Sequence, residues 1–265
     1  QGKARARLVT PVTRGAGATA ARAPDGVVWA MADLPRAILF DLDETIISFG
    51  RRPLLLLEVA ETFGADLAPV TPQQVANAME AKFRWFWSDE DRHRQWRFRL
   101  EAARVEVARL AFRDLGAPAD VARPFAERFH AYREAQAAFF PGALEALDTL
   151  KARGVRLALV TNGDAGPQRA KVERFDLAPR FDHVQIEGEH GFGKPEERAY
   201  LHALQALGVG PHETWMVGDN LEWEVAAPQR LGIYAIWHDH LGEGLPPDSP
   251  VRPDRIIRSI AELVE

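Results

Sequence analysis

Short apolar runs alternate with amphipathic stretches along most of this chain. The runs lie at residues 37–40, 155–160, 183–186, 214–217, 233–237 and 256–257. Helical periodicity fills the intervals at about 142–153, 167–175, 196–207 and 222–231. Because the runs are almost continuously apolar, we expect strands that are buried on both faces, as in a parallel sheet. The alternation therefore predicts an α/β fold in which helices cover both faces of that sheet.

The connection between the first two predicted strands is too long for a single crossover helix. It contains several signals that begin or end helices. They predict helices that start at Pro53, at the capping box Thr71-Pro72-Gln73-Gln74, at Ser88 and near Ala119, with Gly116 ending the third. We therefore predict an all-helical domain at 51–138, inserted into a core domain made of residues 31–50 and 139–265.

Composition and charge narrow the possible partners. The chain has 265 residues, of which 46% are hydrophobic and 27% charged, as is ordinary for a globular protein. A formal net charge of -5 argues against a nucleic acid polymer or a membrane surface as partner. Absence of cysteine excludes disulfides and thiolate metal sites, and is compatible with a cytoplasmic location. No apolar run approaches the roughly 20 residues needed to cross a bilayer, and the oligomeric state stays open.

The first part of the chain differs in composition from the rest. Residues 1–24 contain Arg and Lys but no acidic residue, together with many Gly, Ala and Thr. Such a composition fits a transit peptide or a tag-derived or upstream translated extension. Because Met31 precedes a short polar segment and then a strand, we predict that residues 1–30 are an N-terminal extension, tag-derived or disordered.

Polar segments follow several of the predicted strands, where open α/β sheets bind their ligands. Residues 41–45 (DLDET) follow the first strand, 161–164 (TNGD) the second, and 218–224 (GDNLEWE) the fourth. The pair Lys194-Pro195 precedes the helix predicted at 196–207. Each segment alone is typical of a turn, a helix cap or a solvated lysine. Together, at one edge of a sheet, they predict a site for phosphate chemistry.

These four segments, in this order, resemble the motifs of the haloacid dehalogenase superfamily, and the resemblance covers most of the chain after Met31. It implies a Rossmann-like doubly wound parallel sheet core with an inserted all-helical C1 cap. It also implies a phosphatase that depends on Mg²⁺ and hydrolyses a small phosphorylated metabolite through an aspartyl-phosphate intermediate.

A cation is needed because a phosphate ester repels a carboxylate nucleophile, and a divalent ion between them offsets that repulsion. Asp41 and Asp219 can supply two of the oxygen ligands that Mg²⁺ prefers, and by the resemblance the main-chain carbonyl of Asp43 supplies a third. Asp41 is then the nucleophile. Asp43 protonates the leaving oxygen and later deprotonates the attacking water, a contribution of about 10²–10⁴-fold.

The other segments supply groups for the phosphoryl oxygens. Thr161 and Asn162 offer a hydroxyl and an amide, and Lys194 offers a cation for the phosphoryl group and for Asp41. Three further residues are expected to support the metal and the lysine: Thr45, Asn220 and Glu224. The family often places an Asp where this chain has Glu224, so either Glu222 or Glu224 could take that role.

The presence of Asp43 distinguishes among the reactions of the superfamily. By the resemblance, dehalogenases lack this second acid, because a halide leaving group needs no protonation, and phosphonatases resemble dehalogenases in lacking it. The presence of Lys82, the one lysine between residues 51 and 138, leaves the cap lysine of phosphonatases open, but Asp43 argues against both reactions. A phosphomutase shares the whole core and stays an alternative. A non-catalytic scaffold is disfavoured by the complete acid–lysine set.

The inserted segment contains the information about specificity. Aromatic and basic residues crowd residues 81–100: Lys82, Phe83, Arg84, Trp85, Phe86, Trp87, Arg92, His93, Arg94, Trp96, Arg97 and Arg99. Packing of helices explains most of them, while some could stack on a base or sugar or meet an anionic group. A cap that closes over the site implies a small substrate.

Overall fold

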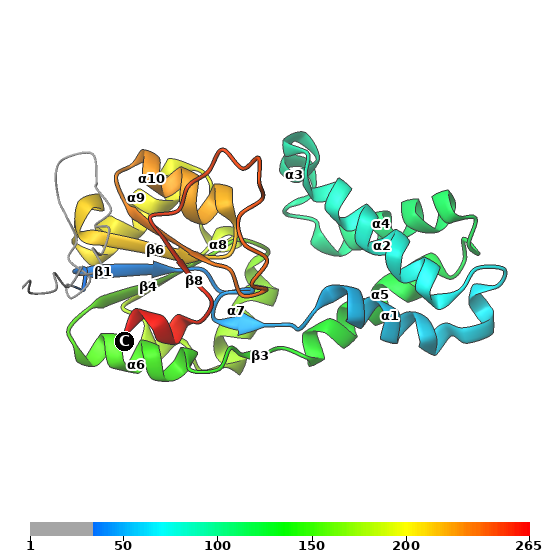
Figure 1. The fold of residues 1–265 in the computed structure, drawn as a ribbon, viewed down its shortest axis with the longest axis horizontal. Helices are drawn as coiled ribbons and strands as arrows, with labels where there is room; N and C mark the ends of the chain where they lie inside the picture. Colours follow the sequence, from blue (N-terminus) through cyan, green and yellow to red (C-terminus); the bar gives the residue numbers. More distant parts are fainter. Residues whose placement is uncertain (1–33) are drawn as a thin grey trace, which may run out of the picture. The chain divides into compact units, whose positions relative to one another are not determined.

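A six-stranded parallel sheet forms the centre of the computed structural model, which describes residues 34–265; the extension predicted at 1–30 lies outside the described residues (Figure 1). The sheet order is β5-β4-β1-β6-β7-β8. Its strands are β1 (Ala37–Phe40), β4 (Arg156–Thr161), β5 (His183–Ile186), β6 (Thr214–Gly218), β7 (Tyr234–His238) and β8 (Arg255–Ile257). All six begin and end within one residue of the predicted runs. Because the chain extends the sheet first to one side of β1 and then to the other, the predicted doubly wound fold is confirmed.

Alternate residues of β1 face opposite layers of the core. Ile38 and Phe40 belong to the cluster formed with α6 (Ala143–Ala152), whereas Ala37 and Leu39 belong to the cluster formed with α9 (Glu197–Leu207). Figure 1 shows these two helices on opposite sides of the sheet. Both faces of the strand are thus buried, which is the reason for its uninterrupted apolar sequence.

Further helices complete the core domain. They are α7 (Ala165–Arg174), α8 (Glu187–His190), α10 (Ala227–Arg230) and the short turns η2 (Ala178–Arg180), η3 (Pro211–Glu213) and η5 (Ile260–Leu263). The single helix predicted at 222–231 is wrong: a π-helical segment η4 (Leu221–Ala226) precedes α10. Pro228 has no amide hydrogen to donate to the preceding turn. The side chain of Asn220 begins η4 by accepting hydrogen bonds from the N–H groups of Glu222 and Trp223, both at 3.0 Å.

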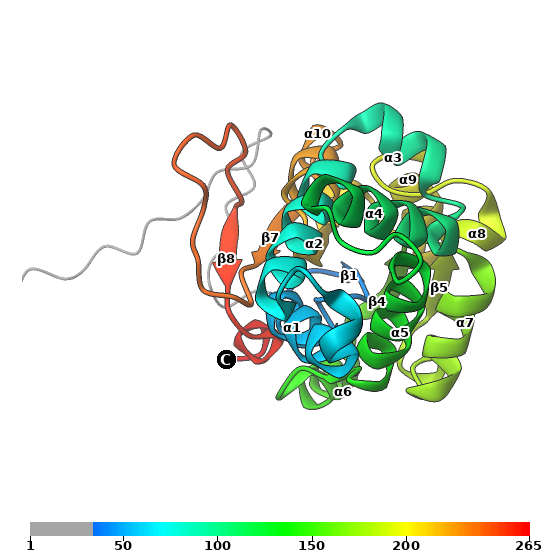
Figure 2. The same ribbon diagram turned by 90° about the vertical axis from the view of Figure 1, so that its right-hand side faces the viewer.

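The chain between β1 and β4 contains five helices that form a layer with its own hydrophobic core. They are α1 (Arg52–Phe63), α2 (Pro72–Trp87), α3 (Glu90–Trp96), α4 (Leu100–Leu115) and α5 (Ala122–Ala135), with the turn η1 (Gly64–Leu67). Apolar residues of α1, α2, α4 and α5 make one buried cluster, separate from those of the sheet. We refer to residues 52–135 as the cap. Figure 2 shows its helices in front of β1 and β4.

Local signals account for most of the cap helices. Both hydrogen bonds of the predicted capping box at Thr71 and Gln74 are present, and Pro53 lies in the first turn of α1. The single helix predicted from Ser88 to Gly116 is wrong, because Asp89 and not Ser88 begins α3, by accepting a hydrogen bond from the N–H of Arg92. This helix then ends, and a new helix, α4, starts after Arg99, whose backbone is not helical.

The remaining cap helix also begins later than predicted. Residues 119–121 form turns, so that α5 starts at Ala122 and not near Ala119. Two short antiparallel strands, β2 (Ile47–Ser48) and β3 (Ala138–Phe139), pair where the chain leaves and re-enters the core. At two residues each, they are too short to give a periodic signal in the sequence. Within the described part of the chain, no helix is both long and apolar enough to cross a membrane.

Candidate active site

A buried lysine joins two carboxylates at the carboxyl end of the sheet. Asp41 directly follows β1, and its N–H donates to the carbonyl of Val217 in β6. The Nζ of Lys194 lies 2.6 Å from Oδ1 of Asp41 and 2.6 Å from Oε1 of Glu224. Burial alone would lower the pKa of Lys194, but the two carboxylates raise it above its ordinary value. The two carboxylates therefore favour the charged form of Lys194, which is held against the predicted nucleophile.

Glu224, and not Glu222, is the acid that reaches this lysine. Its second oxygen accepts a hydrogen bond of 2.8 Å from the N–H of Asn220, and burial raises its pKa to about 7 despite the opposing effect of Lys194. A Cβ on Gly218 would lie 2.0 Å from the Cγ of Glu224, so only glycine permits this approach. Glu222 instead pairs with Arg230 at 3.0 Å.

The predicted acids line one small cavity of about 220 Å³, which we call the carboxylate cavity. Its lining residues are Asp41, Asp43, Glu44, Thr161, Asn162, Asp219, Asn220, Trp223 and Glu224. Asp219 follows β6, and its carbonyl accepts a hydrogen bond of 2.7 Å from the indole of Trp237. Thr45 is fully buried, and no described residue bonds its hydroxyl. The fold thus gathers at one sheet edge the residues that sequence reasoning selected.

Negative charge exceeds positive charge around this cavity. Burial raises the pKa of Asp41 against the effect of Lys194, and burial together with Glu224 and Asp41 raises the pKa of Asp219 well above its ordinary value. Lys194 thus contacts two carboxylates, and the charge of Asp219 also interacts with it. Within residues 34–265, no three His, Asp or Glu side chains are placed so that they could hold a metal ion together. The expected ligands are only two carboxylates, those of Asp41 and Asp219, with the main-chain carbonyl of Asp43, so a third side chain is not needed. The donor set and the surplus charge fit one hard divalent cation.

The loop after β4 holds the lysine loop in place. The Nδ2 of Asn162 donates to the carbonyl of Lys194 at 2.6 Å, and the N–H of Lys194 donates to Oδ1 of Asn162 at 2.9 Å. A Cβ on Gly193 would lie 2.6 Å from that same Oδ1, so glycine is required beside it. The amide of Asn162 is thus engaged by the protein, in contrast to the predicted contact with phosphoryl oxygens.

Two residues of α7 that sequence reasoning missed contact the second aspartate. The Nζ of Lys171 lies 2.9 and 2.7 Å from the two carboxylate oxygens of Asp43. Gln168 donates to Asp43 at 3.2 Å and to the hydroxyl of Thr161 at 3.0 Å. These two side chains are three residues apart on one helix face. That spacing, on the helix that follows a motif-bearing strand, is the signal that could have identified them.

Arg97 of the cap pairs with two carboxylates of the core. Arg97 lies 2.8 Å from Glu196 and 3.2 Å from Glu187. Glu187 is 1% exposed, its other oxygen accepts a hydrogen bond of 3.0 Å from the N–H of Gly163, and burial raises its pKa. The cap therefore supplies the nearest cation to a buried carboxylate that holds the loop after β4.

Replacing Arg97 with Ala is expected to destabilise the protein by about 1–3 kcal/mol, because Glu187 would stay buried without its partner. The free energy of unfolding from urea denaturation measures the effect. Arg84→Ala, which removes an arginine that is 74% exposed and leaves Glu80 paired with Arg52, is the matched control and should change it by less than about 1 kcal/mol. An equal loss in both variants would contradict the role assigned to Arg97.

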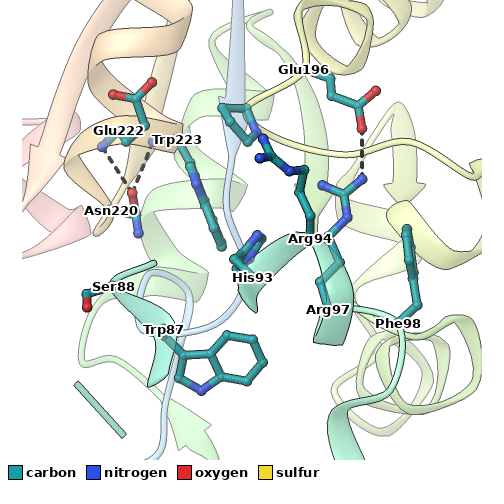
Figure 3. A pocket seen from close by; sticks show the side chains of 11 residues that line it. Trp87, Ser88, His93, Arg94, Arg97, Phe98, Glu196, Asn220, Glu222 and Trp223 are labelled. Carbon is teal, nitrogen blue, oxygen red and sulfur yellow. Dashed lines mark hydrogen bonds and ion pairs between the residues drawn. The ribbon is translucent and has the colours of Figure 1, made fainter. Parts of the chain in front are cut away.

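A larger pocket adjoins the carboxylate cavity. It has a volume of about 820 Å³ and lies between α2, α3 and the following loop of the cap and the core residues after Lys194 and β6 (Figure 3). Its lining residues are Trp87, Ser88, His93, Arg94, Arg97, Phe98, Pro195, Glu196, Asn220, Glu222 and Trp223. Asn220 and Trp223 line both spaces. We call it the cap–core pocket.

Comparison with known proteins shows the family of this chain. The family model of haloacid dehalogenase-like hydrolases matches residues 35–232. The chain belongs to the haloacid dehalogenase-like hydrolase family, which confirms the resemblance drawn from the four polar segments.

Relatives of known activity are similar over part of the chain. A phosphoserine phosphatase from Thermus thermophilus is 38% identical over 161 residues, 60% of this chain and 63% of that protein. A glyceraldehyde 3-phosphate phosphatase from Pyrococcus furiosus is 34% identical over 97 residues, 37% of this chain and 40% of that protein. The match therefore spans less than two thirds of either relative. A solved 2-haloacid dehalogenase from Pseudomonas syringae pv. Tomato is 25% identical with a TM-score of 0.54, and the match covers 87% of this chain and 97% of that one.

Proposed function

We propose that this protein is a Mg²⁺-dependent phosphatase that hydrolyses a phosphate monoester of a small molecule through an aspartyl-phosphate intermediate. The observation that carries the proposal is the buried contact of 2.6 Å between Lys194 and Asp41, in a cavity that Asp43 also lines. A carboxylate held by a cation at a strand end is suited to covalent attack, and a second carboxyl group beside it is suited to proton transfer.

In the first step an oxygen of Asp41 attacks phosphorus, the bond from phosphorus to the ester oxygen breaks, and Asp43 gives its proton to the leaving alcohol. In the second step Asp43 takes a proton from water, the water oxygen attacks phosphorus, and Asp41 leaves as a carboxylate with release of phosphate. Lys194 orients Asp41 and stabilises negative charge on the phosphoryl group.

The carboxylate of Asp43 pairs with Lys171 at 2.7 Å. The first step needs the carboxyl group of Asp43 to face the leaving alcohol, whereas both of its oxygens contact the ammonium group of Lys171 here. We infer that Asp43 leaves Lys171 when an ester enters the carboxylate cavity, and that Gln168 supports it from the same helix.

Asp41, Asp219 and the carbonyl of Asp43 would hold the magnesium ion, which when bound would neutralise charge between the ester and the nucleophile. Thr161 would contribute its hydroxyl to the phosphoryl oxygens. Asn162 would act through Lys194, because its amide already binds the main chain of that residue. We propose that Glu224 supports Lys194 and that Asn220 supports η4. Thr45 would support the segment that contains the nucleophile.

The names of the curated relatives support a phosphatase over the alternative reactions. The phosphoserine and glyceraldehyde 3-phosphate phosphatases act on small phosphate esters by their names. The similarity to a 2-haloacid dehalogenase leaves dehalogenation as the reaction to be tested against, with Asp43 as the residue that argues for the phosphatase. The domain division at residues 50 and 138, the cytoplasmic location and the absence of nucleic acid and membrane partners stay predictions.

Release of inorganic phosphate from p-nitrophenyl phosphate and from a panel of phosphorylated metabolites tests the proposal. We expect turnover with Mg²⁺ and its loss in EDTA, restored when Mg²⁺ is added in excess. Two parallel assays test the alternatives. A dehalogenase would release chloride from 2-chloropropionate. A phosphomutase would form isomerised sugar phosphate after addition of a sugar bisphosphate. Either of these products without free phosphate would overturn the proposal, as would the absence of turnover across the panel.

A further inference from the structure

The cap–core pocket is placed to hold the part of a substrate that is not phosphate. Asn220 and Trp223 line both this pocket and the carboxylate cavity, so an ester at Asp41 would extend past them into the larger space. The pocket volume of about 820 Å³ is near the upper end of the usual range of ligand sites, about 300–1,000 Å³. A three-carbon leaving group would leave most of it empty.

Aromatic rings from both sides supply much of its wall. Trp87 ends α2, His93 lies in α3, and Trp223 lies in η4 of the core. The ring centroids of His93 and Trp223 are 4.8 Å apart, and those of Trp87 and His93 are 5.8 Å apart. Figure 3 shows the indole of Trp223 directed from the core toward His93, with Trp87 on the cap side. Such rings favour a flat, conjugated ligand, because they offer π faces and edges to stack on.

The charged residues of the pocket are paired within the protein. Arg97 binds Glu196 and Glu187, Glu222 binds Arg230, and Arg94 binds Asp91. Among the described residues that line the pocket, positive and negative groups are thus balanced, which favours a leaving group without net charge. Burial lowers the pKa of His93, so its imidazole is neutral near pH 7, with one donor and one acceptor for polar edges of a ring.

We propose that the cap–core pocket binds a neutral aromatic heterocycle, so that the substrates are phosphate monoesters that carry such a ring. This rests on the proposed phosphatase function and goes further by naming the substrate class. The heterocycle could be the base of a nucleoside monophosphate or the ring of a pyridine-type cofactor ester, since both offer a flat face with hydrogen-bonding edges.

Matched esters test the proposal with the full chain and Mg²⁺. Ribose 5-phosphate and adenosine 5′-monophosphate have the same phosphate linkage and differ by the base, and pyridoxal 5′-phosphate represents the other source of a ring. Because stacking of one base on aromatic side chains is worth a factor of about ten or more, we expect kcat/KM for at least one heterocyclic ester to exceed that for ribose 5-phosphate by about tenfold or more. Which ester it is distinguishes the two sources.

Substitution of one ring locates the preference. Trp87→Leu should reduce the ratio of the two kcat/KM values toward one, and Phe98→Leu, on a ring that is 44% exposed, gives a second test that depends less on packing. Trp85→Leu is the matched control, because this tryptophan lies on the same helix, is exposed and does not line the pocket; it should keep the ratio.

The outcomes separate this proposal from the proposed function. Equal or faster turnover of ribose 5-phosphate overturns the substrate class while the phosphatase stands. A preference for the heterocycle that survives both Trp87→Leu and Phe98→Leu overturns the assignment to this pocket. Absence of phosphate release from every ester, p-nitrophenyl phosphate included, overturns the proposed function itself.

Discussion

Replacing Asp41 with Asn is expected to abolish phosphate release, with a fall in kcat of at least about 10⁴-fold, because an amide cannot form the covalent intermediate. The fold should be unaffected. Burial raises the pKa of Asp41, which means that the folded protein disfavours its charge, and Lys194 keeps Glu224 as a partner. We therefore expect the free energy of unfolding of Asp41→Asn to stay within about 1 kcal/mol of the parent protein.

Turnover of p-nitrophenyl phosphate and thermal unfolding measure the two effects separately. Asp148→Asn, an exposed aspartate of α6 that pairs with Arg180, makes the same chemical change away from the site and should retain full turnover. When parent protein is quenched with acid during turnover of p-nitrophenyl phosphate, mass spectrometry should find one phosphoryl group on a peptide that contains Asp41. Near-normal turnover in Asp41→Asn would refute the nucleophile assignment.

Replacing Lys194 with Met is expected to remove both activity and stability. Asp41 and Glu224 would stay buried without a cation, and breaking a buried pair in this way costs about 3–5 kcal/mol. The loss depends on pH with a defined sign. The pKa of Glu224 is already raised to about 7 in the folded protein. Ionisation of this buried group therefore costs stability as the pH rises above the ordinary pKa of a glutamate. Removal of Lys194 enlarges that cost. The difference from the parent protein should therefore be larger at pH 8 than at pH 5.

Urea denaturation at the two pH values measures this difference. The double variant Lys194→Met with Glu224→Gln should regain part of the stability but none of the turnover, because it removes one of the two stranded charges. Lys151→Met, on a partly exposed lysine of α6, should change the free energy of unfolding by less than about 1 kcal/mol. An equally stable Lys194→Met protein would mean that this lysine does not compensate the carboxylates.

Much of the core was predictable from the sequence because the relevant signals are local. A strand buried on both faces needs a continuous apolar run, as at 155–160, and a parallel sheet brings the residues after its strands to one edge. Asp41 and Asp219 follow adjacent strands, so their proximity follows from the strand order alone. The capping box at Thr71 is likewise a contact within one turn, and it is present.

Contacts between distant segments could not be predicted in this way. Lys171 reaches Asp43 across 128 positions of the chain, and Arg97 reaches Glu196 across 99. Neither pairing leaves a periodic or local trace, since each depends on how a helix packs against the sheet or the cap against the core. The cap–core pocket is lined by four separate segments of the chain. For the same reason, the aromatic residues at 81–100 did not by themselves predict this pocket.

The sequence by itself determined the parallel sheet and the acids and lysine at its carboxyl edge, because burial and strand direction are encoded locally. Only the tertiary structure decided which partner each polar group takes. It directed Glu224 and not Glu222 to Lys194, through the π-helical turn that begins at Asn220 and the absence of a side chain at Gly218. It also gave the amide of Asn162 to the main chain of Lys194. The physical reason is that a hydrogen bond or ion pair is fixed by position and direction in space, which the packing of the whole chain sets.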